Sequence, residues 1–247
     1  MNMKKRVLLR ADGYEVRNGR EPFSAERLEG VGVLVIANAA GAPKPQILGI
    51  NIPVPTKKER SDPAFAAGEI EAVRAWVEQG GSLLLIADHA PFGAASAALA
   101  EAFGVKMYEG FAEVPDEVSD PLLFSRENGR LGDHPILSGR GPDSAVQRVT
   151  TFTGQSLDGP KESSVLLKLP PSAVEYVSTG ADELKPQPAG AAQGLALERG
   201  KGRVVVLGEA AMLTAQVASR KPFGMNSPGN DNRQFALNVL HWLSREL

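Results

Sequence analysis

Three short runs of almost continuous apolar residues stand out in the pattern of the chain. They are residues 31–37 (VGVLVIA), 82–87 (SLLLIA) and 203–207 (RVVVL). Runs of this kind, rich in branched side chains, are typical of strands that are buried on both faces, as in a parallel sheet covered by helices. The pattern therefore predicts three central strands of one sheet.

Amphipathic segments separate and follow these runs. Residues 68–79 carry apolar positions at helical spacing, and Gly80-Gly81 then ends the helix. Strand, helix, glycine pair and strand in this order predict a βαβ unit. Two more helices are expected, an alanine-rich one over residues 93–103 and a C-terminal one over residues 232–245.

In the middle of the chain the pattern of apolar and polar positions is less regular, and turn residues are more frequent. Further strands are expected at residues 147–152, 164–169 and 174–178. Residues 108–145 are expected to be loop with short elements, and residues 180–193 an exposed loop. Two apolar stretches around Gly200-Lys201-Gly202 predict a hairpin.

These elements together predict one α/β domain over residues 1–247. The expected architecture is a flavodoxin-like three-layer sandwich with a mostly parallel sheet, helices on both faces and some antiparallel additions. A β-rich insertion is expected around residues 108–193.

Composition narrows the classes of partner and compartment. The formal net charge is -2 and charged residues make up 23% of the chain, without a basic stripe, so no nucleic-acid partner is predicted. No apolar run approaches the roughly 18 residues of a membrane helix, and no secretory leader pattern is present. The sequence as given therefore predicts a cytoplasmic chain without membrane insertion, and export is the alternative if the true N-terminus lies upstream.

The chain contains no cysteine. Disulfides, thiolate metal sites and cysteine nucleophiles are therefore excluded. No glycine-rich nucleotide-binding pattern is present either, so the sequence predicts no particular cofactor, and the question of a metal stays open.

Polar residues follow the central strands, where ligands bind in parallel sheets. Asn38 follows the first strand, Asp88 and His89 the second, and Glu209 the third. His89 is the candidate general base or metal ligand, with Asp88 and Glu209 as catalytic partners and Asn38 as a ligand-binding residue. The alternative is that Asp88 and Glu209 each cap or neutralise a helix end, and that His89 only bonds to the backbone.

Other candidates for ligand binding lie in loops. His134 would complete a two-histidine metal site with His89, or it lies in a simple turn before Pro135. Asn226 and Asn230 belong to a loop that could present amide groups to a polar ligand, or that is only a tight turn.

Two further local patterns bear on function. Phe92, Tyr108 and Phe111 are the aromatic side chains nearest the expected site, and Phe92 is expected to bind the ligand there. Asp231 and Gln234 have the spacing of a capping-box variant before the last helix.

Two segments resemble class I glutamine-amidotransferase-like domains, a group that includes the ThuA-like proteins. The first is residues 69–88, EIEAVRAWVEQGGSLLLIAD, and the second combines residues 202–209, GRVVVLGE, with residues 231–243, DNRQFALNVLHWL. The resemblance implies the fold, and a ligand of carbohydrate type is implied only by the ThuA-like likeness. It implies little about activity, because one fold hosts many functions.

The sequence departs from this family in two respects. The family's nucleophilic cysteine would lie near Asp88-His89, and no cysteine is present, so the family's glutaminase mechanism is excluded and no triad residue can be carried over. Relatives also have a preceding strand, which is either absent here or replaced by residues 5–9.

Three functions stay open on these grounds. The first is a domain that binds a small polar ligand through the residues beyond the strand ends. The second is a metal-assisted hydrolase that uses Asp88 and His89. The third is a structural or assembly module, in which an exposed sheet edge would recruit a partner or a second copy of the chain.

Overall fold

The structure is a computed structural model, and it describes residues 8–41, 46–47, 50–51, 62–115, 121–152, 154–178, 183–218 and 220–247. The helices are α2 (Ala25–Leu28), α4 (Ala67–Glu78), α5 (Phe92–Glu101), α6 (Pro135–Ser138) and α7 (Asn232–Leu243), with short 3₁₀ turns η1 (Pro142–Ser144) and η2 (Ala211–Leu213). The main sheet contains β1 (Val33–Ala37), β4 (Ser82–Ile86), β5 (Lys106–Met107), β9 (Leu157–Asp158), β10 (Ser164–Lys168), β13 (Ala192–Arg199) and β14 (Gly202–Leu207).

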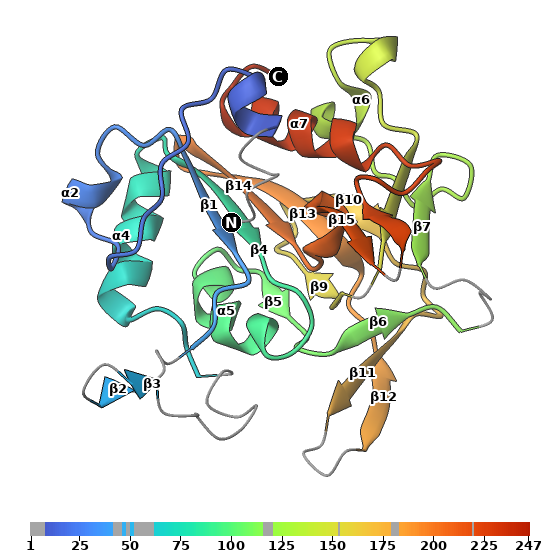
Figure 1. Cartoon of the computed structure of the whole chain (residues 1–247), viewed down its shortest axis with the longest axis horizontal. Coiled ribbons are helices and arrows are strands. Elements are labelled where there is room, and N and C mark those ends of the chain that lie inside the picture. Colours follow the sequence, from blue (N-terminus) through green and yellow to red (C-terminus); the bar gives the residue numbers. More distant parts are fainter. Residues whose placement is uncertain are drawn as a thin grey trace.

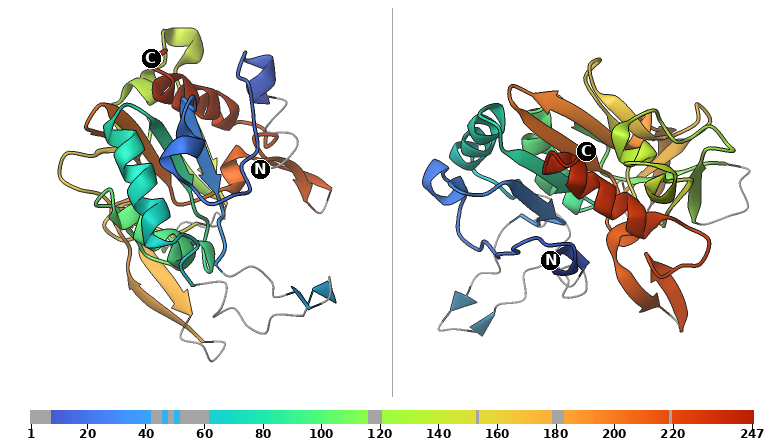
Figure 2. Two further views of the ribbon diagram at one scale, coloured as in Figure 1. Left: turned by 90° about the vertical axis from the view of Figure 1, so that its left-hand side faces the viewer. Right: turned by 90° about the horizontal axis from the view of Figure 1, so that it is seen from above.

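Smaller sheets surround the main one. They are formed by β6 (Phe111–Glu113), β11 (Val174–Ser178) and β12 (Leu184–Pro188), by β7 (Leu122–Ser125) and β8 (Arg148–Thr151), by β15 (Ala215–Ala218) and β16 (Lys221–Gly224), and by β2 (Gln46–Ile47) and β3 (Ile50–Asn51). The β11–β12 and β15–β16 hairpins project from the body of the molecule (Figures 1 and 2).

The main sheet is mixed, with the order β1-β4-β14-β13-β9-β5 and β10 also paired with β13. β1, β4 and β14 are parallel neighbours. β13 is antiparallel to β14, β9 and β10, and β5 is antiparallel to β9. The prediction of a mostly parallel sheet was therefore wrong, because a tight hairpin reverses the chain between β13 and β14, and β5, β9 and β10 join the sheet through antiparallel pairs without helical crossovers.

Both faces of the three parallel strands are covered. Leu84 and Val205 face α7 and pack in a core with Phe235, whereas the neighbouring Leu83 and Val204 face α4 and α5 in a second core. Because successive side chains of a strand point to opposite faces, a strand covered on both sides must be apolar at every position. The helices on both sides of these strands (Figure 1) thus explain the unbroken apolar runs in the sequence.

Most predicted elements are present close to their expected bounds, among them the hairpin of β13 and β14. The exposed loop expected over residues 180–193 was wrong in part, because β12 is a strand there and β13 begins at Ala192. The exposure was correct for β12, whose five residues are all exposed. Residues 8–11 form a helical turn, so Leu8 and Leu9 do not continue a first strand, and residues 5–7 lie outside the described residues.

Candidate functional site at the carboxyl end of the parallel strands

The three parallel strands deliver Asn38, Asp88 and Glu209 to the same edge of the sheet. The register aligns Ala37 with Ile86 and Ile86 with Leu207, so the residues that follow lie side by side. The Asp88 N–H donates a hydrogen bond to Asn38 Oδ1 at 2.9 Å. The sequence-based expectation that these positions converge is therefore met in the geometry.

His89 is held in a defined orientation beside Asp88. Its backbone N–H donates to Asp88 Oδ1 at 3.0 Å, and its ring Nδ1 lies 2.9 Å from the carbonyl oxygen of Ala90. A carbonyl oxygen only accepts hydrogen bonds, so Nδ1 carries the proton. When the ring is neutral, this tautomer leaves the lone pair on Nε2, which has no partner among the described residues and can accept a hydrogen bond.

Glu209 is fully buried and its carboxylate is already engaged. Oε1 accepts the N–H of Ala211 and Oε2 that of Met212, each at 2.7 Å. These are backbone donors at the beginning of η2, as expected for a carboxylate that caps a helical turn. The geometry thus matches the alternative considered from the sequence, in which this glutamate stabilises a helix end.

Gln155 is the residue at this edge that sequence reasoning missed. Its fully buried side chain donates from Nε2 to the carbonyl oxygens of Ala87 at 2.9 Å and Asp88 at 3.1 Å, and its Oε1 accepts the Glu109 N–H at 2.9 Å. It therefore cross-links the end of β4 to the loop between β5 and β6. No local pattern marks it, because its partners lie 46 to 68 residues away in the chain.

The adjacent Ser156 has a structural role. Its hydroxyl oxygen accepts the Gly190 N–H at 2.8 Å, and its backbone N–H donates to Glu175 Oε2 at 2.9 Å. Burial raises the pKa of Glu175, although hydrogen bonds from Ser156 and Gly110 oppose that change. These contacts attach the sheet of β6, β11 and β12 to the main sheet.

The three aromatic candidates are distributed over different contacts. Phe92 begins α5, is half-buried, and donates its N–H to the His89 carbonyl, so it lies one turn from His89. The Tyr108 hydroxyl donates to Asp158 at 2.6 Å, and this hydrogen bond raises the pKa of Tyr108 to about 12. Phe111 stacks on Tyr176 at 5.5 Å between ring centres.

His134 lies at the other end of the sheet from His89. It precedes α6, where its Nδ1 accepts the Ile136 N–H at 3.2 Å. Its ring packs edge-on against Trp242, with 4.9 Å between the ring centres. Trp242 in turn contacts Arg203, which is aligned with Ser82 at the beginning of β4. The structure therefore does not bring the two histidines together, because the chain between them crosses from the carboxyl to the amino end of the parallel strands.

Replacing His134 by asparagine should change the pH dependence of stability. Burial, with a further contribution from Arg203, lowers the pKa of His134 from 6.5 to about 4. Because the folded protein disfavours the charged ring, the stability that is present above pH 6.5 is lost as pH falls through about 4. The expected loss is about 2–3 kcal/mol after allowing for the partial exposure of the side chain. Asparagine keeps the helix cap but does not titrate. Urea unfolding from pH 7 to pH 4 should show the wild type losing that much more stability than the variant, and parallel curves would contradict the prediction.

The loop that contains Asn226 and Asn230 uses its amides to hold itself together. Asn226 Nδ2 donates to the Gln216 carbonyl and Asn230 Nδ2 to the Gly224 carbonyl, each at 3.2 Å. The predicted capping box was wrong, since Asp231 makes no side-chain cap and instead accepts the N–H groups of two residues at the beginning of β8, Gln147 and Arg148. The tight-turn alternative thus describes this loop.

Asn232 is a second structural residue that the pattern did not reveal. It is fully buried, and its side chain accepts from Thr150 N–H at 2.9 Å and donates to the carbonyls of Thr150 at 2.7 Å and Met212 at 3.2 Å. It therefore joins the beginning of α7 to β8 and η2.

The described residues contain no group of three or more His, Cys, Asp or Glu side chains arranged to hold a metal ion. Within the same part of the chain, no helix is both long and apolar enough to cross a membrane.

No protein-family model and no curated protein matches the sequence. Solved structures do match in fold. The N-terminal domain of mmIFT52 has a TM-score of 0.63 at 15% identity, covering 98% of this chain and 89% of that one. The cytoplasmic protein STM3548 from Salmonella typhimurium has 0.53 at 15% identity (98% and 86%), and a ThuA-like protein from Bacteroides uniformis has 0.50 at 14% identity (97% and 82%). The fold of the chain is therefore one that it shares with ThuA-like proteins, as the resemblance in its sequence implied.

Proposed function

We propose that this chain is an amidotransferase-like domain that binds a small, hydroxyl-bearing polar molecule at the carboxyl end of β1 and β4. The observation that carries the proposal is the hydrogen-bonded group of Asn38, Asp88 and His89 at that edge. The chain has no cysteine, so ligand binding is not coupled to cysteine-dependent glutaminase chemistry.

The hydrogen-bonding capacity of this group supports a hydroxyl as the recognised chemical group. His89 Nε2 is an acceptor when the ring is neutral, because Nδ1 carries the proton. Asn38 uses Oδ1 to accept the Asp88 N–H, and its amide N–H groups have no partner among the described residues. A hydroxyl both donates and accepts, so one hydroxyl or a pair of neighbouring hydroxyls matches an acceptor next to a donor.

The neighbouring buried residues support a preformed site. Asp88 is only 9% exposed and accepts a hydrogen bond from the backbone N–H of His89. Gln155 donates hydrogen bonds to the carbonyls of Ala87 and Asp88. Groups held by such contacts do not need to reorganise when a ligand binds, which favours affinity. Glu209 contributes by holding η2 rather than by touching the ligand.

A thermal-shift screen with monosaccharides, disaccharides and linear polyols tests the proposal. A ligand at one hundred times its dissociation constant adds about 2.7 kcal/mol to stability, which corresponds to a rise of about 5–10 °C in melting temperature for a chain of this size. We expect such a shift for at least one compound with the wild type, and its loss in His89→Ala.

A matched control is Glu101→Ala, an exposed position at the end of the same helix that follows His89. This variant should keep the wild-type shift. The proposal fails if no compound in the panel shifts the wild type, or if His89→Ala responds as the wild type does. A His89-dependent shift with a divalent cation alone would also overturn it, in favour of the metal-assisted hydrolase.

A further inference from the structure

A continuous path of buried hydrogen bonds joins the projecting β11–β12 hairpin (Figure 1) to the candidate site. It begins at Glu175 of β11, which is fully buried. Glu175 Oε1 accepts the Gly110 N–H and Oε2 accepts the Ser156 N–H, each at 2.9 Å. Since Gly110 directly precedes β6 and Ser156 directly precedes β9, one side chain of the hairpin holds the beginnings of both strands.

Gln155 continues this path to the end of β4. It is the chain neighbour of Ser156, and its Oε1 accepts the N–H of Glu109, the chain neighbour of Gly110, at 2.9 Å. Its Nε2 donates to the two carbonyl groups that follow β4, at 2.9 and 3.1 Å. The two segments that Glu175 binds are therefore the same two that Gln155 joins to the backbone before His89.

Close packing at two glycines leaves little freedom along this path. A Cβ atom on Gly93, in the first turn of α5, would collide with the side-chain amide of Gln155. A Cβ atom on Gly110 would collide with the backbone carbonyl of Tyr176 in β11. The helix that follows His89 thus lies directly on Gln155, and the segment before β6 lies directly on the hairpin.

The position of Glu175 requires a carboxylate. Each of its two oxygens accepts a backbone N–H, whereas a glutamine there has one acceptor oxygen and would turn an NH₂ group toward the other N–H. Burying an ionised group carries a large desolvation cost. Buried titratable groups of this kind are concentrated near functional sites, where they fix the geometry of other groups.

We propose that Glu175 is a positioning residue for the ligand site, and that it acts through Ser156 and Gln155 to hold the Asp88–His89 segment in its binding orientation. A buried polar group that loses its partner cannot turn to water instead, so the displacement of one member of the path displaces the next. Docking of the hairpin and order at the site are therefore coupled. The ligand in this statement rests on the proposed function, but the coupling is a property of the protein without ligand.

Amide hydrogen exchange of Glu175→Gln, measured without ligand at neutral pH, tests the coupling. Loss of a hydrogen bond to a charged acceptor corresponds to a factor of about 10–100 in the equilibrium for local opening. Residues 111–113 and 174–178 should exchange faster in the variant than in the wild type. Residues 87–92, which make no contact with Glu175 in the printed hydrogen bonds of the path, should also exchange at least about tenfold faster.

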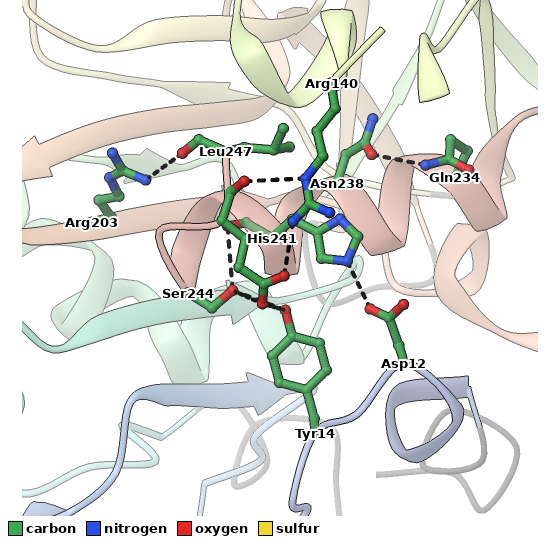
Figure 3. Close-up of polar contacts among 10 residues, drawn as sticks. Asp12, Tyr14, Arg140, Arg203, Gln234, Asn238, His241, Ser244 and Leu247 are labelled. Carbon is green, nitrogen blue, oxygen red and sulfur yellow. Dashed lines mark hydrogen bonds and ion pairs between the residues drawn. The ribbon is translucent and has the colours of Figure 1, made fainter. Parts of the chain in front are cut away.

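The matched control is Asn238→Ala, a buried polar change outside the path. Asn238 Nδ2 donates to the carbonyls of Ile136 and Ser144, each at 2.8 Å, and its Oδ1 accepts from Gln234 Nε2 on the same helix (Figure 3). This variant should be less stable than the wild type, yet exchange of residues 87–92 should stay within about a factor of two. The proposal is overturned if Glu175→Gln affects only the hairpin, or if both variants accelerate residues 87–92 equally.

Glu175→Asp, which keeps the charge and shortens the side chain, provides the same test if Glu175→Gln does not fold. In the thermal-shift screen, the compound that stabilises the wild type should give a smaller shift with Glu175→Gln and an undiminished shift with Asn238→Ala. If none of the sugars and polyols stabilises the wild type, the proposed function fails. The exchange rates of residues 87–92 still decide whether Glu175 positions the Asp88–His89 segment.

Discussion

Replacing Asn232 by leucine should lower the free energy of unfolding by about 3–5 kcal/mol. The side chain is fully buried and makes three hydrogen bonds, to both backbone groups of Thr150 and to the Met212 carbonyl. Leucine has a similar branched shape but satisfies none of them, and each buried polar group left without a partner costs about 1–3 kcal/mol. Urea unfolding measures the loss as a lower midpoint at an unchanged slope.

The matched control for this change is Asn226→Leu, in the loop that precedes α7. Asn226 is exposed, and its side chain makes one hydrogen bond, to the Gln216 carbonyl at 3.2 Å. Its replacement should alter stability by no more than about 0.5 kcal/mol. Equal losses for the two asparagines would show that Asn232 does not join α7 to β8 in the way that the geometry indicates.

Replacing Gln155 by methionine should lower the free energy of unfolding by about 3–4 kcal/mol. The methionine side chain has a length and shape similar to those of glutamine. It leaves the carbonyls of Ala87 and Asp88 and the N–H of Glu109 without their partner. Because the Asp88 carbonyl lies next to the proposed ligand site, the variant should also bind the ligand more weakly. Thermal or urea unfolding gives the first effect, and the thermal-shift screen gives the second.

Gln187→Met, on the exposed strand β12, is the control for the side-chain exchange itself. It should leave both stability and the ligand-induced shift unchanged. A Gln155→Met protein that keeps wild-type stability would contradict the assignment of this glutamine as a cross-link at the sheet edge.

The local pattern of the sequence was a good guide to elements whose formation depends on neighbouring residues. The runs at β1, β4 and β14 are apolar at every position because helices cover both faces, and this requirement is visible in one dimension. The spacing of apolar residues in α4 and α7 is likewise a local property, as is the hairpin between β13 and β14.

The direction of the remaining strands was not predictable in this way. β9, β10 and β5 are short, and their pairing depends on contacts between segments far apart in sequence. β12 was missed because its residues LKPQP are all exposed and include two prolines, a composition that also suits a loop. Its pairing with β11 and the attachment of β11 through Glu175 decide that it is a strand.

The same distinction between local pattern and long-range contacts applies to the candidate site. The sequence by itself determined that Asn38, Asp88, His89 and Glu209 follow buried strands, that these residues share one edge, and that no cysteine chemistry operates there. Only the tertiary structure decided which polar groups are already used, since the carboxylate of Glu209 holds η2, Gln155 binds the end of β4 and His134 lies at the opposite edge. The physical reason is that the pattern of apolar residues reports burial along the chain, whereas a hydrogen bond depends on which distant segments meet in space.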